Sequence, residues 1–110
     1  MGIFIVKKEE DGHYYVSLKV KRGHILLNSI KHRSKSSCKD GIEIIRANAT
    51  DNLKYEYKKT FDGKFYFRLK SVHGEILGNS KFYETAEHRN FGIETMRRIA
   101  PLASVVDLAS

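Results

Sequence analysis

Apolar and polar residues alternate along the chain in short runs that are separated by turn signals. Between residues 14 and 21 the apolar side consists of Tyr14, Val16, Leu18 and Val20, and the polar side of Tyr15, Ser17, Lys19 and Lys21. A period of two over such a run predicts a β-strand with one buried and one solvated face. Asp11-Gly12 precedes this run, and Asp62-Gly63 precedes a similar run at 65–70. Both dipeptides predict β-hairpin turns, because glycine readily adopts positive φ.

The two runs belong to a tandem repeat. An offset of 51 residues aligns the two halves of the chain without a gap. The identical pairs at this offset include Gly12/Gly63, Tyr15/Tyr66, Leu18/Leu69, Gly23/Gly74, Asn28/Asn79, Ser29/Ser80, Gly41/Gly92 and Arg46/Arg97. Recurrence on this scale indicates two copies of one structural unit. We call residues of about 3–51 the first copy and residues of about 54–108 the second copy.

Each copy continues from its strands into a helix. After a third predicted strand, Ser34 and Thr85 are suitable N-caps, because their hydroxyls can accept hydrogen bonds from free amides of the first helical turn. The residues that follow at helical spacing are Cys38, Ile42, Ile45 and Ala49 in the first copy, and Ile93, Met96 and Ala100 in the second. A glycine in a helix costs about 1 kcal/mol relative to alanine. Its recurrence as Gly41 and Gly92 predicts a close approach of helix to sheet.

The predicted unit is therefore β-β-β-α, and residues 103–108 after Pro101 read as a closing strand. A single copy of this size is marginally stable, because three strands and one helix bury little surface. We therefore predict one domain over residues 1–110, in which the two copies share a core. The expected fold class is α+β, with one antiparallel sheet and two helices packed on one face.

The repeat resembles that of the YegP-like family of small bacterial proteins of unknown function. The resemblance rests on GHYYVSLKVKRGHILLNS with GIEIIRANA, and on GKFYFRLKSVHGEILGNSKFY with GIETMRRIA. It implies tandem β-β-β-α-β units that exchange their last strands, and it implies no catalytic residues. The sequence departs from the family pattern at Lys31-His32, where the second copy has Phe82-Tyr83.

Composition narrows the functional classes. The net charge is +7, and a basic surface permits anionic partners, although solubility alone also explains it. The single cysteine, Cys38, fits a reducing compartment and a buried position in the first helix. No apolar run approaches the length of a membrane span, and the first residues lack a signal-peptide pattern. We expect a cytoplasmic monomer in which the two copies form an internal pseudo-dimer.

Neither the histidines nor the carboxylates form a recognisable catalytic or metal-binding pattern. None of the five histidines recurs in the other copy, and no pair of them has metal-ligand spacing. The recurring carboxylates are explained by turns and exposed helix positions. We therefore expect no enzymatic activity, no metal and no cofactor.

Two sets of residues are candidates for binding. Asn28, Ser29, Asn79 and Ser80 recur at strand ends and could line a groove beside a helix N-terminus. Local hydrogen bonding at the strand-to-helix connection is the alternative interpretation.

The second set lies on the predicted solvated face of the sheet and comprises Tyr15, Lys19, Lys21, Tyr66, Arg68 and Lys70. Aromatic and basic residues on an open sheet can stack on bases and neutralise phosphates, although tyrosine is also a good strand former. The sequence thus favours a non-enzymatic binding or interaction module, and the alternative is a nucleic-acid-binding protein that uses this face.

Overall fold

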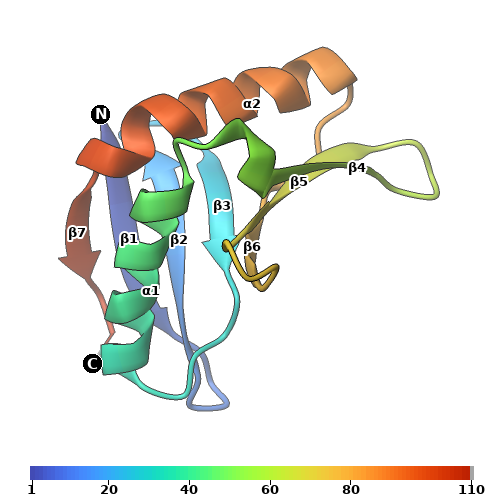
Figure 1. Cartoon of the computed structure of the whole chain (residues 1–110). Helices are drawn as coiled ribbons and strands as arrows, with labels where there is room; N and C mark the ends of the chain where they lie inside the picture. Colours follow the sequence, from blue (N-terminus) through green and yellow to red (C-terminus); the bar gives the residue numbers. More distant parts are fainter. Residues whose placement is uncertain (110) are drawn as a thin grey trace.

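The computed structural model describes residues 1–109, and over these residues two helices cover one face of a single sheet (Figure 1). The first copy contains β1 (Gly2–Lys8), β2 (Tyr14–Val20), β3 (Ile25–Ser29) and α1 (Lys35–Asn48). After a short 3-10 helix, η1 (Asn52–Lys54), the second copy contains β4 (Tyr55–Lys59), β5 (Phe65–Lys70), β6 (Ile76–Asn79) and α2 (Ala86–Ile99). A second 3-10 helix, η2 (Ala100–Leu102), leads into β7 (Ser104–Asp107). The predicted α+β class and the β-β-β-α order of each copy are confirmed.

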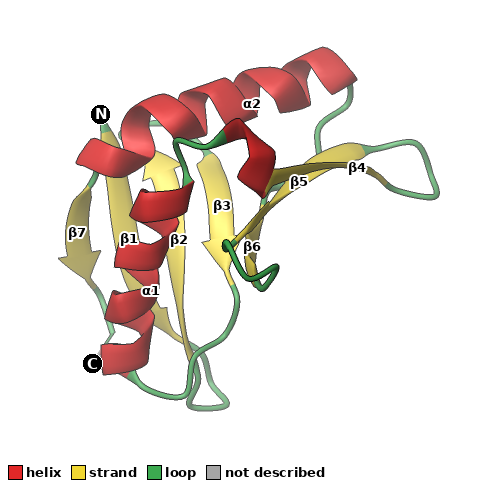
Figure 2. Cartoon of the chain, viewed as in Figure 1, coloured by secondary structure: helices red, strands yellow, loops and turns green. Residues whose placement is uncertain are grey.

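The strand order across the sheet is β4-β5-β6-β3-β2-β1-β7 (Figure 2). The copies meet where β3 pairs with β6, and neighbouring strands are antiparallel except at one edge. At that edge β7 of the second copy pairs parallel to β1 of the first copy. Strand exchange from the second copy to the first is thus confirmed, and it makes the sheet mixed at this edge. The first copy has no separate closing strand among residues 1–109, because Tyr55 and Glu56 of the equivalent segment, residues 53–56, already belong to β4.

The core lies between the sheet and the helices and runs through both copies. Its largest buried side chains come from both copies and include Phe4, Val16, Leu18, Leu26, Ile42, Ile45, Phe67, Leu69, Ile93 and Met96. The alternation of the sequence thus places one side of each strand against the helices. This arrangement leaves the opposite face of the sheet uncovered, and we call that face the open face.

The turns and helix starts follow the sequence signals. Gly12 and Gly63 adopt φ of 89° and 90° in the two hairpins. The Ser34 hydroxyl accepts from the Ser37 N–H at 3.0 Å, and the Thr85 hydroxyl accepts from the His88 N–H at 3.0 Å. These four predictions are confirmed, and they hold because each depends on residues adjacent in the chain.

The recurring helix glycines contact the connection between strand and helix. A Cβ at Gly41 would lie 3.1 Å from the His32 ring, and a Cβ at Gly92 would lie 2.9 Å from Cζ of Tyr83. His32 and Tyr83 form single β-bridges to the first residues of β2 and β5, so they extend the sheet by one position. The close approach predicted from Gly41 and Gly92 is confirmed. His32 is the residue that approaches Gly41, and Tyr83 is the residue that approaches Gly92.

Candidate binding surface on the open face of the sheet

The register of the strands fixes which residues lie on the open face. Residues that pair across neighbouring strands point to the same side, and side chains alternate along each strand. The open face therefore carries Ile3, Ile5, Lys7, Tyr15, Ser17, Lys19, Ile25, Asn28, Glu56, Lys58, Tyr66, Arg68, Lys70, Ile76, Asn79 and Val106. Five predicted site residues, Tyr15, Lys19, Tyr66, Arg68 and Lys70, lie on it. The sixth, Lys21, follows the end of β2, where its N–H bonds to the Met1 carbonyl at 2.7 Å.

Asn28 and Asn79 pair across the junction of the two copies, at the centre of the open face. The Ser17 hydroxyl donates to Oδ1 of Asn28 at 2.6 Å, and Nε of Arg68 donates to Oδ1 of Asn79 at 2.9 Å. Ser17 is fully buried, although the alternation predicted a solvated position. The prediction was wrong because larger side chains around a small serine in mid-sheet cover it.

The serines that follow these asparagines are engaged with the backbone. The Ser29 hydroxyl accepts from the Val16 N–H at 2.8 Å and donates to the Ile30 carbonyl at 2.9 Å. The Ser80 hydroxyl makes the equivalent bonds to the Phe67 N–H and the Lys81 carbonyl at 2.9 and 2.7 Å. Both serines thus make the local hydrogen bonds that the sequence analysis gave as the alternative to a binding groove. Asn79 and Ser80 nevertheless line a hollow on the open face, together with Tyr66 and Arg68.

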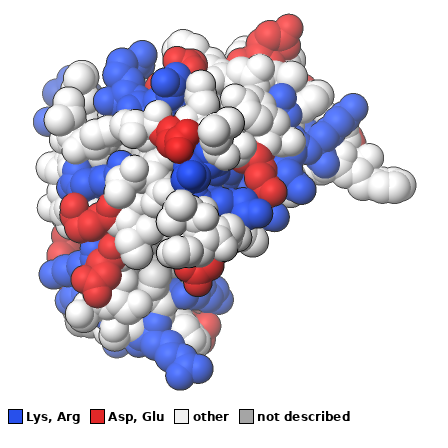
Figure 3. Space-filling model, in the orientation of Figure 1, with Lys and Arg blue, Asp and Glu red and all other residues white. Residues whose placement is uncertain are grey.

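Several cations of the second copy are paired with acids. Oε1 of Glu56 lies 3.6 Å from Arg68, and Oε2 of Glu56 lies 3.3 Å from Lys70. Beside this face, Lys64 pairs with Glu84. Figure 3 shows basic and acidic side chains interspersed on the helix-bearing side as well. On the open face Glu56 therefore offsets part of the charge of Arg68 and Lys70.

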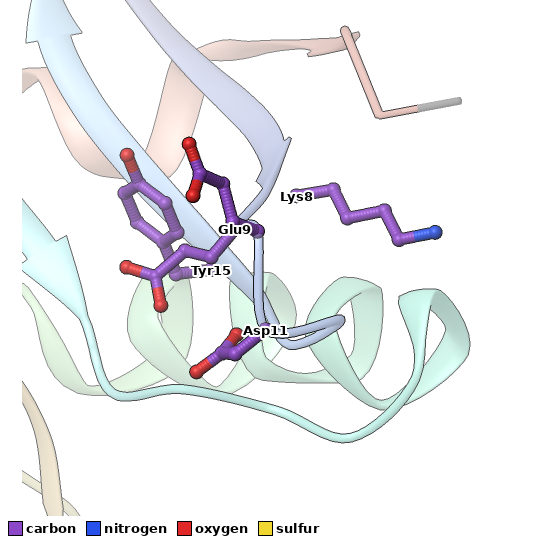
Figure 4. Close-up of a pocket in the computed structure, with 5 residues that line it drawn as sticks. Lys8, Glu9, Asp11 and Tyr15 are labelled. Atoms are coloured by element: carbon purple, nitrogen blue, oxygen red, sulfur yellow. The ribbon is translucent and has the colours of Figure 1, made fainter.

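In the first copy an acidic hairpin borders Tyr15. An open hollow of about 520 Å³ is lined by Lys8, Glu9, Glu10, Asp11 and Tyr15, and Figure 4 shows Lys8 extending away from Tyr15. A hydrogen bond from the His13 N–H lowers the pKa of Asp11, so this carboxylate is charged at neutral pH. Lys31 pairs with Glu9 and Asp11. The hairpin side of Tyr15 is therefore acidic, whereas Nζ of Lys7 lies 5.7 Å from the centroid of the Tyr15 ring.

The equivalent corner of the second copy is aromatic. We call Phe61, Tyr66 and Phe82 the aromatic corner. Phe61 is fully exposed, Phe82 is 63% exposed, and the Phe82 ring packs edge-on against Tyr66 at 5.6 Å. Two hollows of about 460 and 270 Å³ meet here and share Thr60 and Phe82. Exposed rings beside a hollow can bury a large apolar area against a partner.

The sequence reasoning missed Phe61 and Phe82, because neither recurs: Glu10 and Lys31 occupy the equivalent positions in the first copy. It treated repetition as the sign of function, whereas this surface arises from a difference between the copies. Phe61 directly before Asp62-Gly63 was the available signal, because a phenylalanine at a hairpin tip is rarely buried.

Another cavity, of about 260 Å³, lies on the helix side between the β2–β3 turn and α2. Its lining includes His24, Tyr83, His88, Phe91 and Arg98. The Tyr83 hydroxyl is buried, has no hydrogen-bond partner within residues 1–109, and its burial raises the pKa of the phenol. His24 and His88 are both exposed. The sequence does not predict the cavity, because nothing in it places this turn of the first copy beside the helix of the second.

Within residues 1–109 no helix is long and apolar enough to span a membrane. The same residues contain no group of three or more His, Cys, Asp or Glu side chains that could hold a metal ion.

The fold and its open face define a class: a tandem-repeat α+β protein with an intramolecular pseudo-dimer and one uncovered sheet face. The family model named Domain of unknown function (DUF1508) matches the chain twice, at residues 9–56 and 62–107. The chain belongs to this family, and the resemblance to YegP-like proteins is confirmed.

Similar proteins are bacterial. UPF0339 protein YegP of Escherichia coli K12 is 35% identical over 106 residues, which cover 96% of each chain. A UPF0339 protein of Pseudomonas aeruginosa is 33% identical over 94% of each chain. The solution NMR structure of Escherichia coli YegP, described as a protein of unknown function, has a TM-score of 0.93 at 34% identity and covers 99% of this chain and 94% of its own. A UPF0339 protein from Shewanella oneidensis has a TM-score of 0.92 at 26% identity, covering 98% of this chain and 92% of its own.

Proposed function

We propose that the protein is a non-enzymatic interaction module and that the aromatic corner is the centre of its contact surface. The observation that carries the proposal is the exposure of Phe61 and Phe82 beside two hollows. Aromatic residues are enriched at the centres of protein interfaces, where they bury large area with little loss of conformational entropy. Large apolar side chains at an exposed hollow are costly to solvate, and covering them would stabilise a complex.

The surrounding charges favour a protein over a polyanion as the partner. Arg68 and Lys70 already pair with Glu56, and Lys64 with Glu84. A nucleic acid would have to compete with these carboxylates for each cation, which weakens the release of counterions that drives its binding. A protein partner can instead cover the aromatic rings and leave the ion pairs at the rim, as is usual in interfaces.

The test is affinity capture from nuclease-treated bacterial lysate with three forms of the full chain. Phe82→Ala removes the exposed ring, and Leu53→Ala removes another exposed apolar side chain as the matched control, since Leu53 is 89% exposed and outside the corner. We expect one defined protein to be retained by the wild type and by Leu53→Ala, and lost with Phe82→Ala. Equal retention by all three forms would contradict the proposal.

A second candidate function, binding of single-stranded nucleic acid, is supported by one recurring feature of the open face. Lys7 pairs with Tyr15 across β1 and β2, and Lys58 pairs with Tyr66 across β4 and β5. A base stacked on each tyrosine would place its phosphate near the adjacent lysine. Titration with a labelled strand of about 15 nucleotides, which is within the site sizes known for single OB folds, tests this candidate. Affinity that falls steeply with salt and drops in Lys58→Ala supports it, and a flat titration at low salt excludes it.

The assembly and location of the protein belong to the same proposal. We propose a cytoplasmic monomer, because the strand edges of the two copies already pair with each other within the chain at the β3–β6 junction. Light scattering at several concentrations tests the monomer. A dimer that persists on dilution would contradict it.

A further inference from the structure

The two outer edges of the sheet are equivalent in the repeat but differ in the structure. The offset of 51 places Phe4 on Tyr55 and Val6 on Tyr57. The outer edge of β1 is covered by β7, whereas β4 has one neighbour, β5, among the strands of residues 1–109. The structure thus contains one filled strand site and one equivalent edge without a strand.

The filled site shows what such an edge holds. In the parallel register Val105 lies opposite Phe4 and Asp107 lies opposite Val6. The Val6 carbonyl accepts from the Leu108 N–H at 2.9 Å, and the Asp107 carboxylate lies 3.3 Å from Lys35 on α1. The site therefore combines main-chain bonds, one branched aliphatic side chain and one acid that meets cations of the helix.

At the equivalent edge one of the two positions is open, since Tyr55, the equivalent of Phe4, is buried and Tyr57, the equivalent of Val6, is not. Tyr57 is 51% exposed, whereas Val6 is fully buried. Arg89 of α2 lies over the Tyr57 ring at 5.2 Å. In the repeat alignment Arg89 is the equivalent of Cys38 on α1, and the Cys38 side chain is fully buried. A side chain that is buried in the filled site is thus replaced, at the other edge, by a cation that lies over the outer strand.

Chain connectivity explains the difference. The closing strand of the first copy would be formed by residues 53–56, which are the equivalents of 104–107. Tyr55 and Glu56 already belong to β4, so no residues are left to form a strand beside it. The missing strand is a consequence of joining the two copies with so short a connection.

We propose that the outer edge of β4 binds an extended segment of another protein, parallel to β4, as β7 lies parallel to β1. The segment carries a β-branched residue opposite Tyr55 and an acidic residue opposite Tyr57, two positions further on, where it meets Arg89. Addition of a strand to an open edge is an established mode of peptide recognition, in which main-chain bonds provide affinity and alternate side chains provide specificity.

The positive charge at the outer edge of β4 favours an acidic segment over a basic one. Lys58 and Lys59 lie at the end of β4, and lysines at an edge discourage pairing with a strand of like charge. The net charge of +7 also disfavours a second copy of this chain at the same edge. An acidic, aliphatic segment of a different protein fits both observations. This site is separate from the aromatic corner, so the inference does not depend on the proposed function.

The probe for the test is a synthetic peptide with the sequence of residues 103–109, acetylated and amidated, because it contains the Val-x-Asp spacing that the site requires. The isotope-labelled full chain is titrated with this peptide and followed by amide NMR. We expect saturable shifts in β4 and at Arg89, with the β1 amides unchanged. A peptide methylated on alternate backbone nitrogens should lose binding at least about tenfold, because it cannot complete the ladder.

Arg89→Gln provides the matched control for specificity. In the wild type the peptide with Asp should bind about tenfold more tightly than the peptide with Asn at that position, since a charge-assisted bond is replaced by a neutral one. In Arg89→Gln this preference should disappear while the fold, judged by the core amide shifts, is retained. Shifts centred on β1 and β7, an unchanged preference in Arg89→Gln, or no saturable shift in β4 would each overturn the inference.

Discussion

The two copies have the same backbone plan but different surfaces. At the hairpin before the second strand, the first copy carries Glu9, Glu10 and Asp11 beside Tyr15. The second copy carries Phe61 at this hairpin, and Phe82 from the connection after β6 packs against Tyr66. At the sheet edges, the first copy is covered by β7 and the second is open. Recurring residues in this chain therefore mark the scaffold, and the differences between the copies mark the candidate binding surfaces.

Six of the recurring or equivalent residues have a backbone role. Gly12 and Gly63 supply positive φ, Ser34 and Thr85 cap helices, and Gly41 and Gly92 admit a side chain from the strand-to-helix connection. Such roles depend on local geometry that both copies share. Exposed positions carry no such requirement, and they are free to differ.

Separating the copies should have the largest effect. The prediction of one domain implies that residues 1–51 or 52–110 expressed alone cannot fold, because each loses the helix, strands and β7 contacts of the other. We expect no cooperative unfolding transition by circular dichroism and no dispersed amide spectrum for either half. A compact monomer from one half would mean that the repeat is two domains rather than one.

The reactivity of the Cys38 thiol reports whether β7 stays in place beside β1. Burial, followed by the negative charge of Asp107, raises the pKa of this thiol from 9.0 to about 11. The thiolate fraction at pH 8 is then about 100-fold below that of a free cysteine, so iodoacetamide should react at least about 100-fold more slowly than in urea-unfolded protein. Because the folded-state pKa is the higher one, the associated stability is present below pH 9.0 and declines as the pH rises towards about 11. Rapid alkylation of the native protein would show that β7 leaves this edge readily.

The helix glycines should respond differently in the two copies. A methyl group at Gly92 would meet the Tyr83 hydroxyl and its ring, whereas one at Gly41 would meet only the edge of the His32 ring. We expect Gly92→Ala to lower the free energy of unfolding by about 2 kcal/mol, because overpacking outweighs the gain in helix propensity. Gly41→Ala should change it by less than about 0.5 kcal/mol, since the two effects nearly cancel. Urea denaturation of both variants measures the difference, and equal effects would contradict it.

The residues that contact the two glycines, His32 and Tyr83, should differ less in their effect on stability. His32 bonds to the Ser37 hydroxyl at 3.0 Å, whereas the Tyr83 hydroxyl is buried without a partner among the described residues. Tyr83→Phe should therefore raise the free energy of unfolding by about 1 kcal/mol, because it removes an unsatisfied polar group. Ser37→Ala is the matched variant and should lower it by a similar amount. A loss of stability in Tyr83→Phe would indicate that the hydroxyl is satisfied.

The smallest effect is expected at the ion pairs of β7. Desolvation opposes the shift, yet hydrogen bonds from Lys35 and the Ala109 N–H lower the pKa of Asp107 below its ordinary value of 3.8. The sign follows from the lowered folded-state pKa: stability is gained above pH 3.8 and lost as the pH falls through the lower value. Asp107→Asn should flatten the acid side of the stability profile and leave the core amide shifts unchanged. An identical profile for both proteins would show that the pair contributes nothing.

The sequence by itself determined the repeat, the order of its elements, the hairpins, the helix caps and the buried side of each strand, because all of these depend on neighbours within a few residues. It also placed Tyr15, Lys19, Tyr66, Arg68 and Lys70 on the open face. It could not show that Glu56 pairs with two of these cations, since that pairing depends on strand register. Only the tertiary structure decided which edge β7 covers and which remains open, because residues 1–109 contain one closing strand for two equivalent edges.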